Sequence, residues 1–419
     1  MNLDLGVDDP DVHLFVPEGD IKNPEISIVI PAMNETITIS NFIAWCKEGL
    51  SKAGVVGEIL IVDSSSDETP DLALAGGARV LKTPKRGLGR AYIDSIPFIR
   101  GRYVLMGDAD CTYDFREISG FAEKFRSDYE FIMGSRFKGY IEPNSMPALH
   151  RYFGTPLTTW ILNILYSTNF SDIHCGMRGI TRDALIKLKL SSQSWEYASE
   201  MVLKSVCLEL KTTEVPVRFL KDPEGRFSHM KRGGWKEPWR AGWINLRAML
   251  LYGADFFLLR PGFIFFIAGL LLTLPSTFGP LVIGPITISL YWMLLGLTMT
   301  LVGLQSCYLG CIVQVMYDYT PKSGSRWLKL FAYDRSMVVS ACLFVAGLAL
   351  SAPLVVEYLQ LGLKLPVGFG RLSHMAISGL LLIGMGLLTF SSTLVMHAVK
   401  LRRNMPLHPS LARKGLAVV

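Results

Sequence analysis

Two aspartates separated by one alanine are the residues whose type and spacing are most typical of metal chemistry in this chain. Asp108 and Asp110 follow an apolar run at 102–106 that has the pattern of a buried strand. In an extended chain, residues two apart point to the same side, so both carboxylates can face one ligand. Mg²⁺ typically combines one or two carboxylates with substrate phosphates. The pair therefore predicts a divalent cation that neutralises charge on a leaving diphosphate.

Two further segments carry groups that suit a nucleotide. Asp63 follows an apolar run at 58–62, and its carboxylate can accept a hydrogen bond from a base N–H. The alternative here is a helix N-cap, a role that suits Asp67. Residues 85–90 (KRGLGR) combine cations with glycines before a helical pattern, which allows close backbone approach to a phosphate or sugar.

The elements that must position these residues alternate between strand and helix. Apolar runs predict strands at 26–30, 58–62, 79–82, 102–106 and 129–133, and helical patterns lie at 42–53, 69–75, 87–99 and 117–125. This alternation indicates an α/β fold with parallel crossovers. Functional residues should then gather at the carboxyl ends of the strands, where Asn34, Asp63, Asp108 and Asp110 fall.

The last third of the chain has the composition of a membrane domain. Four stretches without Asp, Glu, Lys or Arg lie at 261–279, 286–305, 337–356 and 375–399. Each is long enough to cross a bilayer as a helix, which takes roughly 20 residues. Lys and Arg are concentrated between the second and third stretches and after the fourth, so the positive-inside rule predicts four spans with both termini and the first domain in the cytoplasm. The acidic N-terminus is unlike a signal peptide.

Two segments are typical of helices at the membrane surface. Residues 146–170 and 235–257 combine Trp, Tyr and Leu with Arg and Lys, as interfacial helices do, although ordinary surface helices are the alternative. The net charge of +6 fits anionic headgroups better than nucleic acid. The seven cysteines lack zinc or disulfide spacing. Small residues, among them Gly379, Gly384 and Gly386, allow close helix approach and raise the hypothesis of a homo-oligomer.

Together these patterns predict five regions. They are an N-terminal extension (1–25), a catalytic domain (26–230) that includes the interfacial helix at 146–170, an amphipathic interfacial helix (231–258), a transmembrane domain of four helices (259–400) and a basic cytoplasmic tail (401–419).

The ordered motifs at 29–35 (VIPAMNE), 61–63 (IVD), 87–91 (GLGRA), 107–110 (GDAD) and 134–137 (GSRF) resemble the family-2, GT-A-fold glycosyltransferases. Within that family they are similar to polyprenyl-phosphate sugar synthases of the dolichol-phosphate mannosyltransferase type. Later matches lie at 172–178 and 214–218, so the resemblance covers about residues 26–235 and leaves out the membrane part. It implies a Rossmann-like, mostly parallel sheet that binds a nucleotide-sugar.

The resemblance also implies roles for individual residues. Relatives often place a polar side chain such as Gln two positions after the acidic pair, where this chain has Thr112, so the third protein ligand of the metal is left open. Glu200 would support the site indirectly. The implied site comprises Asp108 and Asp110 on Mg²⁺ or Mn²⁺; Pro31, Asn34, Glu35, Asp63, Lys85, Gly87 and Arg90 on the donor nucleotide-sugar; Arg226, Ser228 and Lys231 closing over the donor; and Arg136 with Arg151 on the lipid phosphate.

The implied reaction is inverting transfer of a sugar from a UDP- or GDP-sugar to a polyprenyl phosphate. A phosphate monoester has a second pKa of about 6, so this acceptor is largely dianionic at neutral pH and needs no general base. One alternative is a processive polysaccharide synthase, whose Gln-x-x-Arg-Trp motif is only poorly imitated at 232–235 (RGGW). The other is a non-enzymatic lipid carrier or flippase with a nucleotide-sugar-sensing domain.

Overall fold

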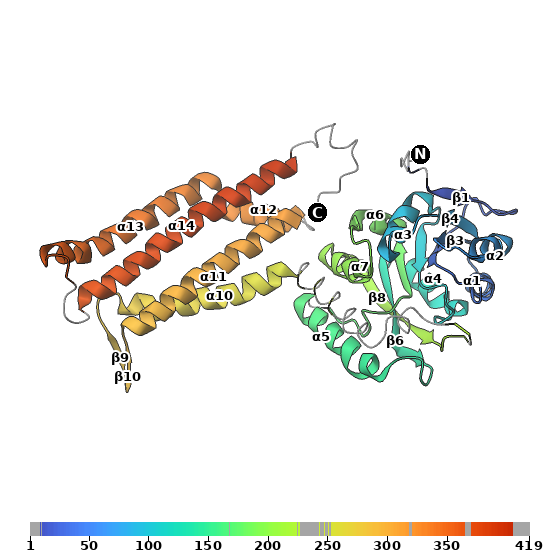
Figure 1. Ribbon diagram of the computed structural model, residues 1–419, viewed down its shortest axis with the longest axis horizontal. Helices are drawn as coiled ribbons and strands as arrows, with labels where there is room; N and C mark the ends of the chain where they lie inside the picture. Colours follow the sequence, from blue (N-terminus) through green and yellow to red (C-terminus); the bar gives the residue numbers. More distant parts are fainter. Residues whose placement is uncertain are drawn as a thin grey trace. The chain divides into compact units, whose positions relative to one another are not determined.

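The computed structural model describes residues 9, 11–166, 168–223, 225–226, 243, 247, 250, 253–317, 321–364 and 370–404. The chain separates into two compact units, Met1–Tyr252 and Gly253–Val419, called here the first and the second unit. Figure 1 shows most strands in the first unit and the longest helices in the second. All the predicted site residues fall in the first unit, and all four apolar stretches fall in the second.

The first unit is built on a mixed sheet that has eight strands in the described part of the chain, in the order β1-β4-β3-β2-β5-β7-β6-β8. The five strands expected from the apolar runs are all present, and one of them matches its predicted range of 79–82. The strands are β1 (His13–Phe15), β2 (Ile26–Ala32), β3 (Gly57–Asp63), β4 (Arg79–Lys82), β5 (Tyr103–Met106), β6 (Phe131–Ile141), β7 (Arg178–Thr181) and β8 (Thr212–Phe219).

The prediction of a mostly parallel sheet is confirmed, with two exceptions: β1 pairs antiparallel with β4, and the second exception, β7, matters for the site. β4, β3, β2 and β5 run parallel, and so do β6 and β8. β7 was not predicted, and it pairs antiparallel with both β5 and β6. Because Arg178 lies opposite Met106, β7 brings the segment at 172–177 to the carboxyl end of β5.

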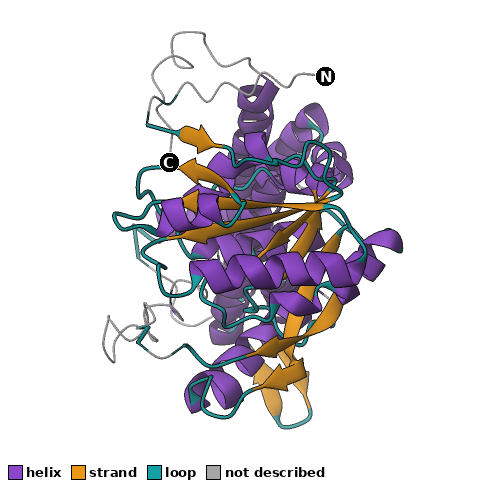
Figure 2. Ribbon diagram, turned by 90° about the vertical axis from the view of Figure 1, so that its right-hand side faces the viewer, coloured by secondary structure: helices purple, strands orange, loops and turns teal. Residues whose placement is uncertain are grey.

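Helices pack around this sheet in two groups (Figure 2). α1 contacts α2 and α4, whereas α3 and α6 both contact α7. α1 buries one face, which includes Phe42 and Cys46, and ends at Gly54, whose φ of 62° suits glycine. The helices are α1 (Ile39–Ala53), α2 (Thr69–Ala75), α3 (Leu88–Ser95), α4 (Ser119–Arg126), α5 (Thr155–Tyr166), α6 (Arg182–Leu188) and α7 (Glu196–Cys207), with the short turns η1 (Ile96–Phe98), η2 (Phe115–Glu117) and η3 (His150–Gly154).

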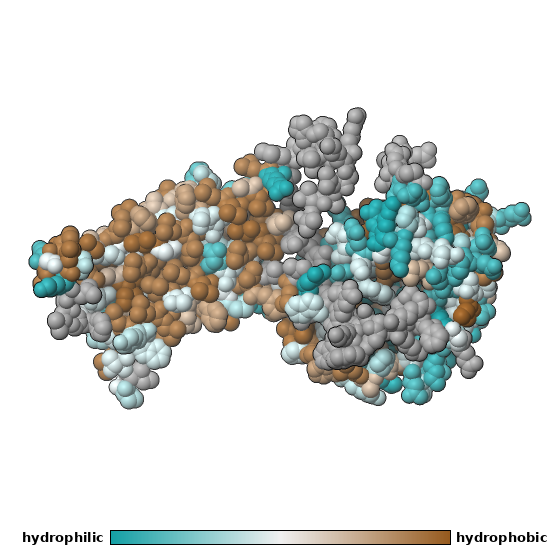
Figure 3. Space-filling model, viewed as in Figure 1, coloured by the Kyte–Doolittle hydropathy of each residue, from teal (hydrophilic) through white to brown (hydrophobic). Residues whose placement is uncertain are grey.

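The second unit contains four helices that are long and apolar enough to cross a membrane, counted over the described residues. The chain is thus a membrane protein by the length and composition of these helices, and the visible face of the unit is mostly hydrophobic (Figure 3). The elements are α10 (Ala254–Thr273), η4 (Leu274–Ser276), β9 (Leu281–Ile283), β10 (Ile286–Ile288), α11 (Leu290–Tyr317), α12 (Pro321–Leu330), α13 (Tyr333–Gln360) and α14 (Arg371–Asn404).

The second span differs from its predicted range of 286–305. Residues 286–288 form strand β10, which pairs antiparallel with β9, and the helix begins only at Leu290. Gly284 lies in the turn with a φ of 58°, and the Ile-Thr-Ile alternation of β10 has the period of a strand. The apolar run therefore contains a hairpin strand followed by a helix, and the prediction of a helix is wrong for its first residues.

The glycines proposed for an oligomer contact lie against helices of the same chain. An added Cβ at Gly379 would meet the carbonyl oxygen of Gly347 at 2.6 Å, and one at Gly386 would meet that of Ser340 at 2.9 Å. At Gly384 the neighbour is a methyl group of Leu301, at 2.8 Å. These small residues allow α14 to approach α13 and α11 closely, and a homo-oligomer stays a prediction that needs another surface.

Candidate active site

The aspartate pair lies in the loop after β5, and hydrogen bonds on either side of the pair fix this loop. The hydroxyl of Tyr92 donates to the carbonyl oxygen of Gly107 at 2.9 Å. Cys111 has a φ of 59°, so the chain turns immediately after the pair. Oδ1 of Asp110 accepts from the backbone N–H of Thr112 at 2.9 Å and from its hydroxyl at 2.6 Å. Thr112 therefore orients Asp110 in this structure.

The two carboxylates are half-buried. Burial raises the pKa of Asp108 to about 7, and the nearby Asp110 adds to the shift. Burial also raises the pKa of Asp110, while Arg226 and the hydrogen bonds from Thr112 act in the opposite direction. Two acidic groups this close favour a positive partner.

Arg226 supplies that positive charge and joins the pair to Glu35. Its Nε and Nη2 donate to Oε2 and Oε1 of Glu35, both at 2.7 Å. Its Nη1 lies 3.3 Å from Oδ2 of Asp110 and 3.0 Å from Oδ1 of Asp222. Burial alone would lower the pKa of Arg226, but these carboxylates raise it above its usual value. One guanidinium thus contacts carboxylates from the loops after β2, β5 and β8.

Asp63 lies at the end of β3 and is fully buried. It accepts from the hydroxyl of Ser65 at 2.5 Å and from Nζ of Lys82 at 2.6 Å. Lys82 was not assigned from the sequence. The feature that could have indicated Lys82 is its position as the last residue of the neighbouring strand β4, where it pairs with Asp63.

The loops after β2 and β3 are tied together at the same edge. Asn34 has a φ of 58°, its N–H donates to Oγ of Ser65 at 2.8 Å, and its Oδ1 accepts from the N–H of Ser66 at 3.1 Å. Pro31 lies in β2, opposite Val62. The structure therefore brings Pro31, Asn34, Glu35 and Asp63 to one edge of the sheet, and their contact with a nucleotide stays a prediction.

The glycines at 87 and 89 serve close packing of protein on protein. A Cβ at Gly87, whose φ is 112°, would lie 2.3 Å from the carbonyl oxygen of Gln193, and one at Gly89 would lie 2.2 Å from that of Ser192. The N–H of Arg90 donates to the same Gln193 oxygen at 3.0 Å. In this structure the glycines let residues 192–193 approach the start of α3.

The side chains of this segment point to different partners. Arg90 forms an ion pair with Asp94 at 2.7 Å, and Lys85 is exposed. Donor binding by Lys85, Gly87 and Arg90 stays a prediction.

Glu200 holds the loop that packs on these glycines. Its buried carboxylate accepts from the N–H groups of Ser191 at 3.0 Å and Ser192 at 2.8 Å. It also pairs with Lys204 at 2.5 Å. Glu200 therefore fixes the backbone of the loop at 191–192, and an indirect role at the site stays a prediction.

Arg136, in β6, is held by an aspartate that sequence reasoning did not assign. Its Nε and Nη2 donate to the two carboxylate oxygens of Asp172 at 2.7 and 2.9 Å, and its backbone N–H donates to the same side chain at 3.1 Å. The guanidinium also lies 5.3 Å from the ring centroid of Phe219. Asp172 therefore orients the Arg136 side chain. Contact of Arg136 with a lipid phosphate stays a prediction.

The segment at 172–178 forms a tight loop against the aspartate pair. The N–H of Gly176 donates to the Tyr113 hydroxyl at 2.8 Å, and a Cβ on Gly176 would lie 2.6 Å from Oδ2 of Asp108. Arg178 shapes the loop by donating to three backbone carbonyls, those of Ile173, Cys175 and Ala198. Tyr113 and Gly176 are thus neighbours of the aspartate pair. The fold reveals this proximity, whereas the sequence did not indicate it.

Arg151 lies in η3, which has π-helical geometry and leads into α5. The predicted interfacial segment at 146–170 is thus helical in its middle part. Its apolar side chains recur at helical spacing and are exposed, and some of this surface is visible at α5 in Figure 3. They are Leu149, Tyr152, Phe153, Leu157, Trp160 and Ile164. Most of the second interfacial segment lies outside the described residues, as do Ser228 and Lys231.

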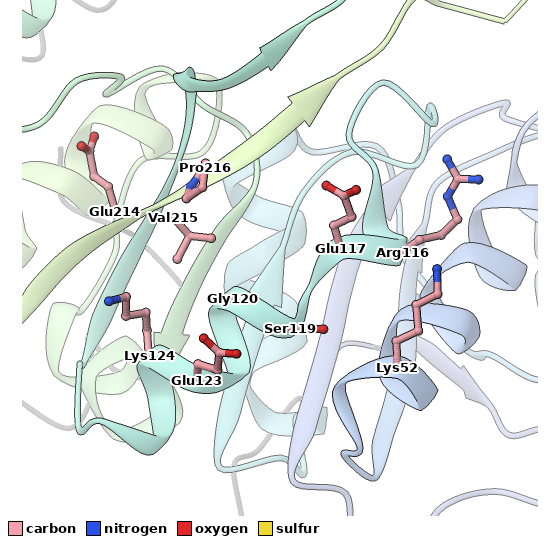
Figure 4. A pocket seen from close by; sticks show the side chains of 10 residues that line it. All are labelled: Lys52, Arg116, Glu117, Ser119, Gly120, Glu123, Lys124, Glu214, Val215 and Pro216. Carbon is pink, nitrogen blue, oxygen red and sulfur yellow. The ribbon is translucent and has the colours of Figure 1, made fainter.

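A separate surface groove contains none of the predicted site residues (Figure 4). Its walls come from the end of α1, η2, α4 and β8, and they carry both acidic and basic side chains. The groove lacks the strand-end carboxylates that a nucleotide-sugar site requires.

The residues present fit a divalent cation that shares its coordination with a ligand. Among the described residues no group of three or more His, Cys, Asp and Glu could hold a metal ion by itself. Asp108 and Asp110 offer two carboxylates, which suits Mg²⁺ or Mn²⁺ when a diphosphate and water supply the remaining oxygens.

Comparison with known proteins shows the family of this chain. Residues 27–189 match the model of glycosyl transferase family 2, and residues 311–400 match that of the glycosyltransferase family 2 C-terminal transmembrane region. A low-salt glycan biosynthesis hexosyltransferase of Haloferax volcanii is 32% identical over 364 residues, which are 85% of this chain and 86% of that protein. A dolichyl-phosphate hexose transferase of the same organism is 25% identical over 162 residues, 39% of this chain and 69% of the relative.

Among solved structures, a glucosyl-3-phosphoglycerate synthase from Mycobacterium tuberculosis in complex with Mn²⁺ and UDP matches with a TM-score of 0.42 and 17% identity. The match covers 55% of this chain and 80% of that one. The 32% identity over most of both chains and the two matched family regions decide the assignment. The chain belongs to glycosyl transferase family 2 and is a glycosyltransferase with a C-terminal transmembrane region.

Proposed function

We propose that this enzyme transfers a hexose from a UDP- or GDP-sugar to a polyprenyl phosphate and so makes a polyprenyl-phosphate-linked monosaccharide. The observation that carries the proposal is the meeting of Glu35, from the loop after β2, and Asp110, from the loop after β5, on Arg226, with Asp63 at the end of the adjacent strand β3. Such an edge is where a parallel α/β sheet binds a nucleotide.

On the donor side, the loops after β2 and β3 receive the nucleotide. Asp63 and Lys82 present an acceptor and a donor side by side, a pair that suits the N–H and C=O of uracil or guanine. Asp108 and Asp110 would hold Mg²⁺ or Mn²⁺, which when bound neutralises charge on the leaving diphosphate. Arg226 lies beside them and can direct a nitrogen to a diphosphate oxygen.

On the acceptor side, the phosphate is itself the nucleophile. With a second pKa of about 6 it is mostly dianionic at neutral pH, so the protein needs to position it rather than deprotonate it. Arg136 and Arg151 are the proposed contacts, because an arginine fork matches phosphate oxygens. The exposed apolar residues of η3 and α5 would rest in the headgroup layer and bring these arginines to the lipid.

Attack by the phosphate in line with the leaving diphosphate inverts the anomeric carbon. An α-linked donor would then give a β-linked product. We place the first unit and both termini in the cytoplasm, in line with the basic residues between the second and third spans.

The test uses the purified full-length protein with a panel of UDP- and GDP-sugars, Mg²⁺ or Mn²⁺, and a short polyprenyl phosphate. We expect one donor to give a lipid-linked monosaccharide with a β linkage by NMR. An α-linked product would refute in-line inversion. Long polymer would favour a processive synthase, and no transfer with any donor would refute the proposed acceptor.

A further inference from the structure

The cation that contacts Asp110 in this structure is a side chain of the protein itself. We propose that Arg226 is the resident counter-cation of the aspartate pair and exchanges with the divalent cation: it contacts Asp110 before the metal binds, and it leaves Asp110 while still held by Glu35 once the metal is bound. This inference rests on the proposed function for its metal.

The argument begins with the oxygen atoms of Asp110. Oδ1 is engaged by the N–H and the hydroxyl of Thr112, at 2.9 and 2.6 Å. Oδ2 is the atom that Arg226 approaches, at 3.3 Å. Because Oδ1 is already hydrogen-bonded, Oδ2 is the better oxygen for a metal ion. Arg226 and the metal therefore compete for one atom.

Electrostatic repulsion opposes the simultaneous presence of Arg226 and a divalent cation at Oδ2 of Asp110. A divalent ion bonded to Oδ2 would lie about 2 Å from that oxygen and so only a few ångströms from the guanidinium. Two cations at such a distance repel strongly where water is scarce. Both aspartates are half-buried, and the Arg226 side chain is 9% exposed, so water screens this repulsion incompletely.

The remaining contacts of Arg226 allow it to leave Asp110 without leaving the site. Nε and Nη2 stay on Glu35 through two bonds of 2.7 Å, and Nη1 is the nitrogen that lies near Asp110, at 3.3 Å, while donating to Oδ1 of Asp222 at 3.0 Å. Glu35 is itself buried, and its N–H donates to the hydroxyl of Thr69 at 2.9 Å. Small movements of the Arg226 side chain would turn Nη1 toward a diphosphate oxygen that arrives with the metal.

A competing interpretation makes Arg226 a permanent replacement for the metal. In that case the site would not need a divalent cation, and removal of the arginine would create no new affinity for one. The two interpretations give opposite expectations for metal binding in the absence of nucleotide.

The experiment is a titration of the nucleotide-free, full-length protein with Mn²⁺, in which free Mn²⁺ is measured by electron paramagnetic resonance. Arg226→Gln should bind Mn²⁺ at least about tenfold more tightly than the wild type, since a unit charge about 6 Å from a divalent ion is worth roughly that factor even with the screening of water. Arg226→Lys keeps the charge but loses the fork, and it should show a smaller gain.

The matched control is Arg116→Gln. Arg116 makes a two-point contact with Asp114, at 2.7 and 2.8 Å, outside the aspartate pair, and its loss should leave Mn²⁺ affinity unchanged. Adding Asp110→Asn to Arg226→Gln should abolish the gain. If Arg226→Gln does not fold, the Arg226→Lys variant decides the question.

Unchanged or weaker Mn²⁺ binding in the Arg226 variants overturns the exchange, and so does the absence of Mn²⁺ binding in every variant. The readout needs neither sugar nor lipid. A tenfold gain together with no transfer to polyprenyl phosphate would therefore refute the proposed function and leave the exchange standing.

Discussion

Arg136 and Asp172 form a two-point ion pair in the interior of the first unit, with Nε to Oδ2 at 2.7 Å and Nη2 to Oδ1 at 2.9 Å. Both side chains are buried. The pair joins β6 to the loop that precedes β7, and the same loop places Gly176 against Asp108. The proposed lipid-phosphate contact and the aspartate pair are thus oriented by one loop.

Loss of Asp172 should therefore affect both stability and acceptor binding. Asp172→Ala leaves a buried guanidinium unpaired, and we expect a loss of about 3–5 kcal/mol in the free energy of unfolding. Asp172→Asn keeps the volume and should raise KM for polyprenyl phosphate more than KM for the nucleotide-sugar. Thermal unfolding and steady-state kinetics measure the two effects. An equal rise in both KM values would argue against a role on the acceptor side.

Removal of one carboxylate of the pair should eliminate transfer and leave the membrane domain intact. For Asp110→Asn we expect transfer to fall by at least about 10²-fold, because charge on the leaving group loses its electrostatic stabilisation. Thr112→Val removes one of the two hydrogen bonds that orient Asp110 and should cause a smaller loss. Transfer assays on protein extracted from membranes test both variants. Unchanged transfer in Asp110→Asn would remove the pair from the mechanism.

Gly89 should tolerate no side chain. A Cβ there would lie 2.2 Å from the Ser192 carbonyl oxygen and 2.7 Å from Cβ of Tyr197, so the backbone must move. We expect Gly89→Ala to destabilise the protein by about 1–3 kcal/mol and to lower transfer. Gly54→Ala is the control: its φ is 62°, but no atom lies within 4 Å, so it should cost about 1 kcal/mol and leave transfer unchanged. Equal effects of the two variants on transfer would contradict the packing role.

Stability should depend on pH through His174. Burial lowers the pKa of His174 to about 4, and the ring accepts or donates a hydrogen bond with Thr158 at 2.7 Å. The unfolded chain, with a pKa of about 6.5, binds more protons than the folded protein between pH 4 and 6.5. The contribution of His174 to stability should therefore be lost as pH falls through this window, by up to about 3 kcal/mol.

The measurement is thermal unfolding of the wild type and His174→Gln at several pH values from 4 to 7. The wild type should lose more stability than the variant on acidification. Parallel curves for the two proteins would show that His174 does not contribute.

The exposed face of η3 and α5 should matter for lipid substrates only. Phe153 and Trp160 are 60% and 61% exposed, so Phe153→Ser and Trp160→Ser should fold normally. We expect a several-fold lower kcat/KM with a long-chain polyprenyl phosphate in vesicles, because less apolar area enters the headgroup layer. With a short, water-soluble acceptor, kcat/KM should be the same as for the wild type. Ile186→Ser, at another exposed apolar residue, is the control, and an equal effect of that variant would contradict membrane contact by α5.

Local patterns in the sequence determined the elements and the residue types at their ends. The strand at 79–82 and the helix at 69–75 match β4 and α2, and the apolar stretches located the four candidate spans. The spacing of Asp108 and Asp110 after an apolar strand indicated metal chemistry without a structure. Such features are readable because periodicity and helix length depend on neighbouring residues.

The tertiary structure decided which distant residues meet. Arg226 contacts Glu35 across 191 positions, and Arg136 contacts Asp172 across 36. The antiparallel insertion of β7 brings Gly176 to Asp108, and the glycines expected at a phosphate also admit the 192–193 backbone. No local pattern specifies these pairings, because they follow from how the strands order themselves in the sheet and how the loops between them close and pack.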